Sequence, residues 1–418
     1  MLSLQARAAY EENELRRRRL LNADPFSLFV PAGGADIDFV AGTALGGTQP
    51  YGNNNNDGRL FRDPSNVVAC ILPNADGTYS AVGANGIRRS TKGAYNYPSA
   101  TVRNLWGSDL TNAAWVVSGA GADITKAKDQ VSVEGLANTA SSLTCANANG
   151  TVLQSITLAS ANQLYQVKIK RLFGTGTIWM TIDGGTTWQD VTAQINGGAN
   201  YATAFITQNS VLNPVIGFKM LTPGDKIAVD CNMLFTPPVI AGWTAVPRED
   251  LVRTAGATIL NSQSRPSADI ADAAPNTLIN IARGNFAFYH ECVSLRPIGG
   301  FLITGATGIF CSVDASSVGA VKFSANAGQS ITAAGAWKSD GVGINRTVGW
   351  FASDGTVKVC CNGKLGTLGT GGTAEVALDH FDLSTNGSGA NSQISWTRRF
   401  MMAPNLSLTD AQMLLMAP

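Results

Sequence analysis

Apolar and polar positions alternate in three stretches near the middle of the chain, at residues 163–171, 177–182 and 226–235. A period of two sends successive side chains to opposite faces of a strand, so each stretch predicts a strand with one face in a core. Turn residues separate these stretches at short intervals, which is typical of a β-sandwich or jelly roll. The pattern predicts an all-β module over residues 103–236.

A second module of the same class is expected over residues 263–418, with strand candidates at 286–295, 300–303, 309–313, 321–324, 346–352 and 356–361. Pro237 and Pro238 end the last strand of the first module, so residues 237–262 predict a connector. Residues 26–102 are rich in Gly and Asn turns and predict an irregular β-rich linker region. The predicted fold class is all-β, with two β-sandwich (jelly-roll) modules that follow an N-terminal helix and this linker region.

The N-terminal helix is expected at residues 3–21, within an attachment segment at 1–25. Ser3 can cap its start, and three glutamates precede four arginines at a spacing that allows i,i+4 ion pairs. The apolar stripe is thin, so the helix is marginal alone and is expected to dock on another protein or on its own copies. The arginine run predicts a solvated, ion-paired face rather than a nucleic-acid contact, because no aromatic residues interleave it. The residues assigned to attachment are Leu4, Ala8, Leu15, Arg16, Arg17, Arg18 and Arg19.

The composition excludes several classes of protein. Hydrophobic residues make up 44% of the chain, which argues against disorder, and the formal net charge is +1, which favours neither nucleic acid nor a charged membrane surface. Charged residues are only 14%, so little charge keeps copies apart, and we expect a homo-oligomer, with a trimer favoured. The sequence contains no run of about 18 apolar residues, so we expect no membrane insertion. The charged N-terminus does not resemble a signal peptide.

The seven cysteines are an odd number and contain no C-x-x-C pair. We expect all of them to be small buried hydrophobic side chains made in a reducing cytoplasm, without disulfides. Residues 53–58 begin like a calcium loop, but Pro64 occupies the twelfth position, so they predict a polar turn. No metal ligand or cofactor is assigned, although calcium at the rim of a sandwich stays open.

Catalytic chemistry has weak support in the sequence. His290 and Cys292 would share one face of a strand, but a core histidine is the favoured interpretation over a nucleophilic dyad. His380 lies between two acids and is expected in a solvated turn. No local pair of carboxylates suggests glycoside hydrolysis, so we expect a protein that is not an enzyme.

Tryptophans are the natural residues for a sugar site, because a flat ring stacks on a pyranose while polar neighbours bind its hydroxyls. The glycan-binding candidates are Trp179, Trp188 and Trp106. Trp179 is the first candidate, since it stands between Ile178 and Met180 and must face the opposite side of their strand. Trp115 and Trp350 have apolar surroundings and are expected in cores.

Two segments resemble known families. Residues 181–188 match the Asp-box pattern S/T-x-D-x-G-x-T-W, found repeatedly in sialidases; here it occurs once and predicts a stabilised hairpin, with Asp183 on its own turn and Gly184 and Gly185 at positive φ. Residues 103–115 resemble the segment R-x-N-L-x-x-x-S-x-x-L/F-x-N-A-x-W, which opens a carbohydrate-binding-module-like β-sandwich in tailed-bacteriophage virion proteins. The matching residues are Arg103, Asn104, Leu105, Ser108, Leu110, Asn112, Ala113 and Trp115.

The second module resembles the concanavalin-like (laminin-G-like) jelly roll. Residues 348–363 follow its strand, turn and strand that end in Asn-Gly, and residues 405–412 resemble its short closing helix, with Gln412 or Asp410 in place of the usual Glu. The two resemblances imply a bacteriophage virion structural protein, made in the host cytoplasm, that joins other virion proteins through its N-terminus. A fibre or receptor-binding protein that contacts host surface glycans is the first expectation. A head fibre or capsid decoration protein without glycan binding is the second, and a glycan-degrading tail spike is the third.

Overall fold

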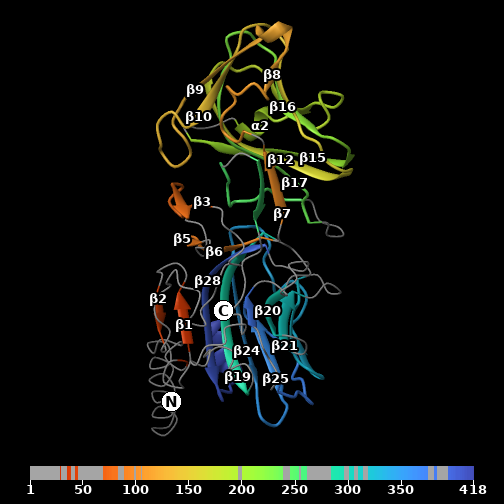
Figure 1. Ribbon diagram of the computed structural model, residues 1–418. Helices are drawn as coiled ribbons and strands as arrows, with labels where there is room; N and C mark the ends of the chain where they lie inside the picture. The colour runs from red at the N-terminus through yellow and green to blue at the C-terminus, as the bar shows by residue number, and fades with distance from the viewer. Residues whose placement is uncertain are drawn as a thin grey trace, which may run out of the picture. The chain divides into compact units, whose positions relative to one another are not determined.

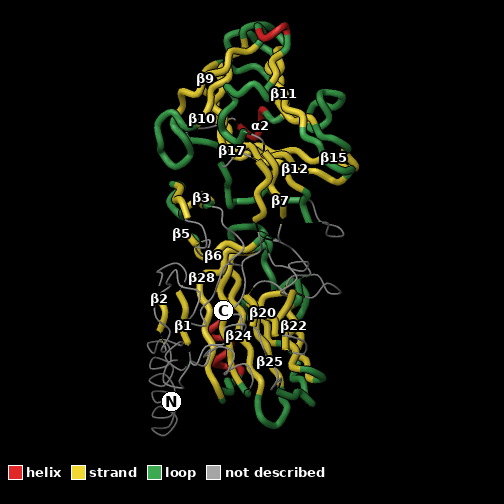
Figure 2. The backbone as a smooth tube through the Cα atoms, viewed as in Figure 1, coloured by secondary structure: helices red, strands yellow, loops and turns green. Residues whose placement is uncertain are grey.

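Antiparallel strands make up nearly all of the regular structure in the computed structural model, which confirms the all-β prediction. Figure 2 shows how short the helical segments are beside the strands. The chain divides into two units, one of residues 62–262 and one of residues 1–61 with 263–418. The structure describes residues 29, 35–38, 43–45, 69–82, 89–97, 100–104, 106–195, 200–238, 245–253, 256–260, 284–295, 301–305, 309–313, 319–374, 381–383 and 394–418. The predicted attachment segment lies outside these residues.

The unit of residues 62–262 contains two main antiparallel sheets (Figure 1). The strands of the first are β15 (Ala202–Val211), β12 (Ala161–Phe173), β17 (Lys226–Phe235), β10 (Ala140–Cys145) and β9 (Ile124–Gln130), with β7 (Ala100–Asn104) beside β17 and β18 (Gly256–Leu260) beside β7. The strands of the second, in order, are β14 (Gln189–Asp190), β13 (Ile178–Thr181), β16 (Val215–Met220), β11 (Gly150–Ser155) and β8 (Val116–Val117). The same unit holds the 3-10 turn η2 (Gly119–Gly121) and the one-turn helix α2 (Thr192–Ile195).

Side chains from both sheets meet in one apolar core. Phe218 of β16 stacks on Trp115, with ring centroids 6.4 Å apart. It also packs against Tyr165 of β12, with ring centroids 6.0 Å apart. Ile178 and Met180 of β13 are fully buried, as the alternating pattern predicts. Trp115 is buried too, which confirms its expected place in a core.

The segment at residues 103–115 holds the central strand β17 in place. The Ser108 hydroxyl donates to the Asp230 carboxylate and accepts from the Cys231 backbone N–H at 2.9 Å. The Asn232 amide donates to the Gly107 carbonyl at 2.9 Å. Cys231 has a φ of +48°, where the pairing of β17 with β12 shifts register, so these contacts fix a β-bulge. The matched segment therefore has a structural role here.

Residues that precede and follow the predicted module of residues 103–236 in the sequence belong to the same unit and pack onto it. The buried Arg248 pairs with Asp250 at 2.8 Å and lies over the Tyr97 ring at 4.3 Å. The Gln166 side chain of β12 both donates to and accepts from the Arg248 backbone, at 2.9 and 2.7 Å. The hairpin strands β3 (Cys70–Pro73) and β4 (Tyr79–Val82) and the pair β5 (Arg89–Ser90) and β6 (Gly93–Asn96) belong to this unit as well. The predicted domain limits at 102, 236 and 262 stay a prediction.

The other unit is also built from two sheets, and their strands run antiparallel (Figure 1). The first has the order β2 (Thr43–Leu45), β1 (Ala35–Asp38), β28 (Ser395–Pro404), β19 (Phe286–Ser294), β24 (Ile344–Phe351), β25 (Val357–Cys361) and β26 (Lys364–Leu365). The second has the order β23 (Gly328–Ile331), β22 (Val321–Ala325), β21 (Ile309–Val313), β20 (Phe301–Gly305) and β27 (Phe381–Leu383). Phe286 and Phe288 of β19 contact Phe323 of β22, at centroid distances of 6.0 and 5.0 Å.

The helix α4 (Asp410–Met416) lies near the C-terminus, partly within the predicted helical segment. Thr409 caps it: its hydroxyl accepts from the Gln412 N–H, and the Gln412 side chain accepts from the Thr409 N–H at 2.8 Å. This reciprocal pair is a capping box. Gln412, rather than Asp410, therefore stands in place of the Glu that is usual in the closing helix of the jelly roll. Met413 and Met416 then pack into a core with Tyr289 and Met401.

Candidate functional site

A row of four side chains crosses the solvent-facing side of the sheet that contains β13 and β16. Trp179 is the register partner of both Asp190 on β14 and Lys219 on β16, and Lys219 is the partner of Thr151 on β11. Directly opposed residues of antiparallel strands project from the same face, so these four side chains form one line. We call Asp190, Trp179, Lys219 and Thr151, together with the nearby Trp188, the tryptophan row.

The row faces away from the core of its unit. Ile178 and Met180 flank Trp179 and are fully buried, whereas Trp179 itself is half-buried, so it faces the opposite side, as predicted. Trp188 and Lys219 are half-buried and Asp190 is exposed. Neither Trp179 nor Trp188 has a hydrogen bond from its indole N–H within the described chain, and neither N–H is among the buried groups without a partner. Both indole donors are therefore open to solvent.

The Lys219 ammonium joins the two tryptophans. Its Nζ atom lies 4.2 Å from the centre of the Trp179 ring and 4.8 Å from the centre of the Trp188 ring. An ammonium above an indole face is attracted by the negative face of the ring system. Sequence reasoning missed this lysine, because it lies about forty residues beyond Trp179 and only the pairing of β13 with β16 brings the two together.

The Asp-box hairpin positions Trp188. Asp183 accepts hydrogen bonds from the Thr187 backbone at 2.9 Å and from Gln208 at 2.7 Å, and Thr181 donates to it at 2.9 Å. Burial alone would raise the pKa of Asp183, but these bonds outweigh burial and lower its pKa to about 2. Gly185 has a φ of +94°, and a Cβ there would lie 2.8 Å from the Trp188 ring. The predicted stabilised hairpin is confirmed.

The other predicted site residues are not part of the row. Trp106 is 41% exposed and follows β7, a strand of the other sheet in its unit. The attachment residues from Leu4 to Arg19 lie outside the described residues, as does His380. A binding role for Trp106, Trp179 and Trp188 stays a prediction at this stage.

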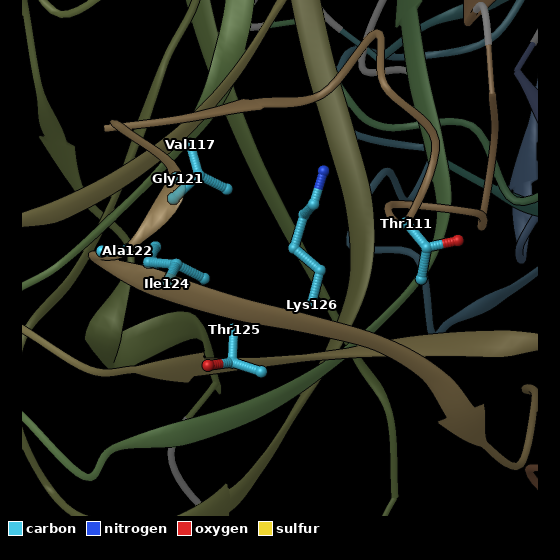
Figure 3. Close-up of a pocket in the computed structure, with 7 residues that line it drawn as sticks. All are labelled: Thr111, Val117, Gly121, Ala122, Ile124, Thr125 and Lys126. Carbon is cyan, nitrogen blue, oxygen red and sulfur yellow. The ribbon is translucent and has the colours of Figure 1, made fainter. Parts of the chain in front are cut away.

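A pocket of about 400 Å³ lies elsewhere in the unit of residues 62–262, and Figure 3 shows its lining. Thr111, Val117, Gly121, Ala122, Ile124, Thr125 and Lys126 line it. Lys126 points away from Thr125 across β9 (Figure 3), and its Nζ donates to the Trp115 carbonyl at 2.6 Å and the Asn112 carbonyl at 3.3 Å. Burial lowers the pKa of Lys126. The lysine is thus engaged in holding the segment that ends at Trp115.

His290 and Cys292 do not form a nucleophilic pair. His290 is buried, and its Nε2 lies 3.3 Å from the Thr397 hydroxyl, while its Nδ1 has no partner in the described structure. Burial lowers the pKa of His290 to about 4 and raises the pKa of the Cys292 thiol well above its usual value. A neutral, buried thiol is a poor nucleophile. All seven cysteines are free and buried, as the sequence predicted.

In the described part of the chain, no group of three or more His, Cys, Asp and Glu side chains could hold a metal ion. No helix there is long and apolar enough to cross a membrane.

Comparisons with known proteins give distant similarities. No family model matches the chain, and no curated protein matches it. Among solved structures, the chain is similar to the CBM40 of the Ruminococcus gnavus IT-sialidase bound to alpha2,3 sialyllactose, with 11% identity and a TM-score of 0.26 over 35% of this chain and 89% of that one. It is also similar to the C-terminal CBM6 of LamC, a marine laminarinase from Zobellia galactanivorans, with 13% identity and a TM-score of 0.22 over 33% of this chain and 98% of that one. Both are carbohydrate-binding modules, but at TM-scores this low the likeness carries no argument about function.

The buried His290 predicts a pH-dependent stability of its unit. The folded pKa of about 4 lies below the ordinary value of 6.5, so the unfolded chain binds the proton more readily between these values. The free energy of unfolding should therefore fall as the pH drops from about 6.5 to about 4, by up to ~3 kcal/mol for this one group. Urea unfolding at several pH values, with His290→Gln as the control that lacks the titration, measures the effect. An NMR titration that gives His290 a pKa near 6.5 would contradict it.

Proposed function

We propose that this chain is a non-enzymatic glycan-binding protein that holds sugar on the tryptophan row. The observation that carries the proposal is the placement of Trp179 and Trp188 around Lys219, on the solvent-facing side of a sheet and beside Asp190 and Thr151. Rings supply surfaces for stacking, and the neighbouring groups supply a carboxylate, an ammonium and a hydroxyl for the sugar hydroxyls. This combination matches what pyranose recognition needs.

The row is formed before any ligand arrives. Core residues on the inner face of β13 and β16 fix both strands, and the Asp-box hairpin fixes Trp188 through the Asp183 bonds. Binding then costs little ordering of side chains, which favours affinity on a small surface.

A binding role without catalysis is supported by the acids near the row. Asp190 is the one carboxylate of the row, and its Oδ1 accepts from the Thr192 N–H at 2.8 Å. Asp183 has a pKa of about 2 and engages both oxygens in hydrogen bonds, so it is unsuited to donate a proton to a leaving group. Glycoside hydrolysis usually needs one carboxyl as acid and a second as base or nucleophile across the bond. The row therefore favours binding over a glycan-degrading spike.

We further propose that the protein is a structural component of a bacteriophage virion, with a fibre or receptor-binding role. The similarity of residues 103–115 to the virion-protein segment supports this, and so does the low content of charged residues, which suits packing between copies. One observation favours the second candidate, a capsid decoration or head fibre without glycan binding: the Lys219 ammonium covers part of each indole face. Loss of binding on tryptophan substitution separates these candidates.

Replacing Trp179 by Ala should weaken binding to extracted host-surface glycans about tenfold or more, because the main stacking surface is removed. Binding of the full chain to these glycans is measured by titration calorimetry, with Phe173→Ala as the control, since Phe173 is 70% exposed and lies on β12, a strand of the other sheet. The glycans should keep their chain length after incubation. Unchanged affinity, or a loss of stability of roughly 3–5 kcal/mol that marks Trp179 as a core residue, would refute the binding role.

The virion proposal predicts that residues 1–25 attach the protein to the particle. Deleting them should abolish incorporation into virions while both β units stay folded, because the helix that the sequence predicts there has a thin apolar stripe that needs a partner surface. Incorporation is measured by quantifying the protein in purified particles, and near-UV circular dichroism checks the fold. Normal incorporation of the truncated protein would show that the attachment assignment is wrong.

A further inference from the structure

Lys219 lacks a counter-ion, whereas three other lysines of its unit have one. Lys92 pairs with Glu249 at 2.5 Å, Lys128 with Asp109 at 3.2 Å and Lys226 with Asp129 at 3.5 Å. Over the described chain, Lys219 has neither an ion pair nor a hydrogen bond, although it is half-buried. The ammonium thus has no anionic partner within the described chain, and an anion of another molecule can supply one.

The two indole rings hold the ammonium without using its hydrogen-bond donors. A lysine ammonium carries three N–H donors, and the attraction to an aromatic face leaves them free to bind another group. The Lys219 Nζ lies within 5 Å of both ring centres, so its position is fixed by the two rings, and a sugar stacks on the part of an indole face that the ammonium leaves open.

The acid at the other end of the row does not neutralise this charge. Asp190 and Lys219 are separated by Trp179, because both are register partners of that tryptophan on opposite sides. The Oδ1 of Asp190 is bonded to the Thr192 N–H, toward its own turn. The row thus presents a positive end and a negative end, with an aromatic ring between them.

We infer that the row selects an anionic glycan, a pyranose whose carboxylate, sulfate or phosphate group binds Lys219 while its ring lies on an indole. This inference rests on the proposed glycan binding. The Lys219 Nζ lies 4.2 Å from the centre of the Trp179 ring, so a sugar on the part of the ring that the ammonium leaves open has its anionic group within reach of Lys219. Asp190, on the other side of Trp179, accepts from a ring hydroxyl. Lys219 is the residue that determines specificity.

The test uses matched pairs of polymers that differ only in charge. The pairs are polygalacturonate and its carboxyl-reduced form, dextran sulfate and dextran, and a phosphorylated mannan before and after phosphatase treatment. Affinity electrophoresis of the full chain measures each affinity. We expect one anionic member to bind at least about tenfold more tightly than its neutral partner, with a preference that falls as salt is raised. The pair that shows the preference identifies the anionic group.

Substitutions at Lys219 test whether its ammonium causes the preference for the anionic polymer. Lys219→Met keeps the aliphatic stem against the rings and should remove the preference, so that the charged and neutral members of the pair bind equally, and Lys219→Arg should retain the preference. Lys219→Gln serves if the Met variant is unstable in a melting curve. The matched control is Lys170→Met, which removes an equally unpaired lysine, 5.9 Å from the Tyr201 ring, on the other sheet. It should leave the preference intact.

The outcomes separate the two proposals. Equal affinity for charged and neutral members, or an equal effect of Lys170→Met and Lys219→Met, overturns the anionic specificity while glycan binding stands. Absence of binding to every polymer and to extracted host-surface glycans alike overturns the proposed function itself.

Discussion

The sandwich of residues 62–262 depends on one buried carboxylate, that of Asp230 in the central strand β17. It accepts hydrogen bonds from the Ser108 hydroxyl, from the Val133 N–H at 3.0 Å and from Arg253, whose Nη2 lies 2.9 Å away. Arg253 in turn pairs with Glu134. A buried charge is tolerated only when it is paired and hydrogen-bonded, and removing one partner typically costs about 3–5 kcal/mol. The carboxylate thus requires three distant segments to be in place at once.

The geometry of the tryptophan row depends on the packing of this sandwich. Phe218 and Lys219 are neighbours on β16, and they project to opposite faces of the strand. Phe218 is fixed in the core by Trp115, the last residue of the segment that Ser108 anchors. The position of Lys219 over the two indole rings therefore follows from packing on the inner face. Trp179 and Lys219, the centre of the proposed sugar site, lie on strands rather than on loops, which favours a defined geometry.

Local patterns in the sequence predicted much of the fold. Alternation identified β13 and its buried face, and the Asp-box pattern identified the hairpin around Asp183. The resemblance of residues 405–412 to the closing helix of the jelly roll located part of α4. Each of these rests on residues that are close together in the chain. Two of the three tryptophan candidates lie on the row: Trp179 faces outward because its neighbours Ile178 and Met180 are buried, and Trp188 is placed by the Asp-box hairpin.

Long-range contacts escaped sequence reasoning. Ser108 and Asp230 are 122 positions apart, and no local signal indicates that they bond. Lys219 was missed for the same reason, and so was Glu291, which pairs with both Arg346 and Arg398 across neighbouring strands. Strand pairing alone decides such contacts, and a period of two says nothing about which strands are neighbours.

NMR of the indole N–H groups tests the central claim most directly. These signals are followed while the full chain is titrated with the glycan that it binds. The account predicts that the Trp179 and Trp188 signals shift together with rising ligand, because both donors face solvent beside Lys219, whereas the Trp115 signal from the core stays in place. Shifts confined to Trp106, or to backbone signals around the Lys126 pocket, would contradict it and place the binding site elsewhere.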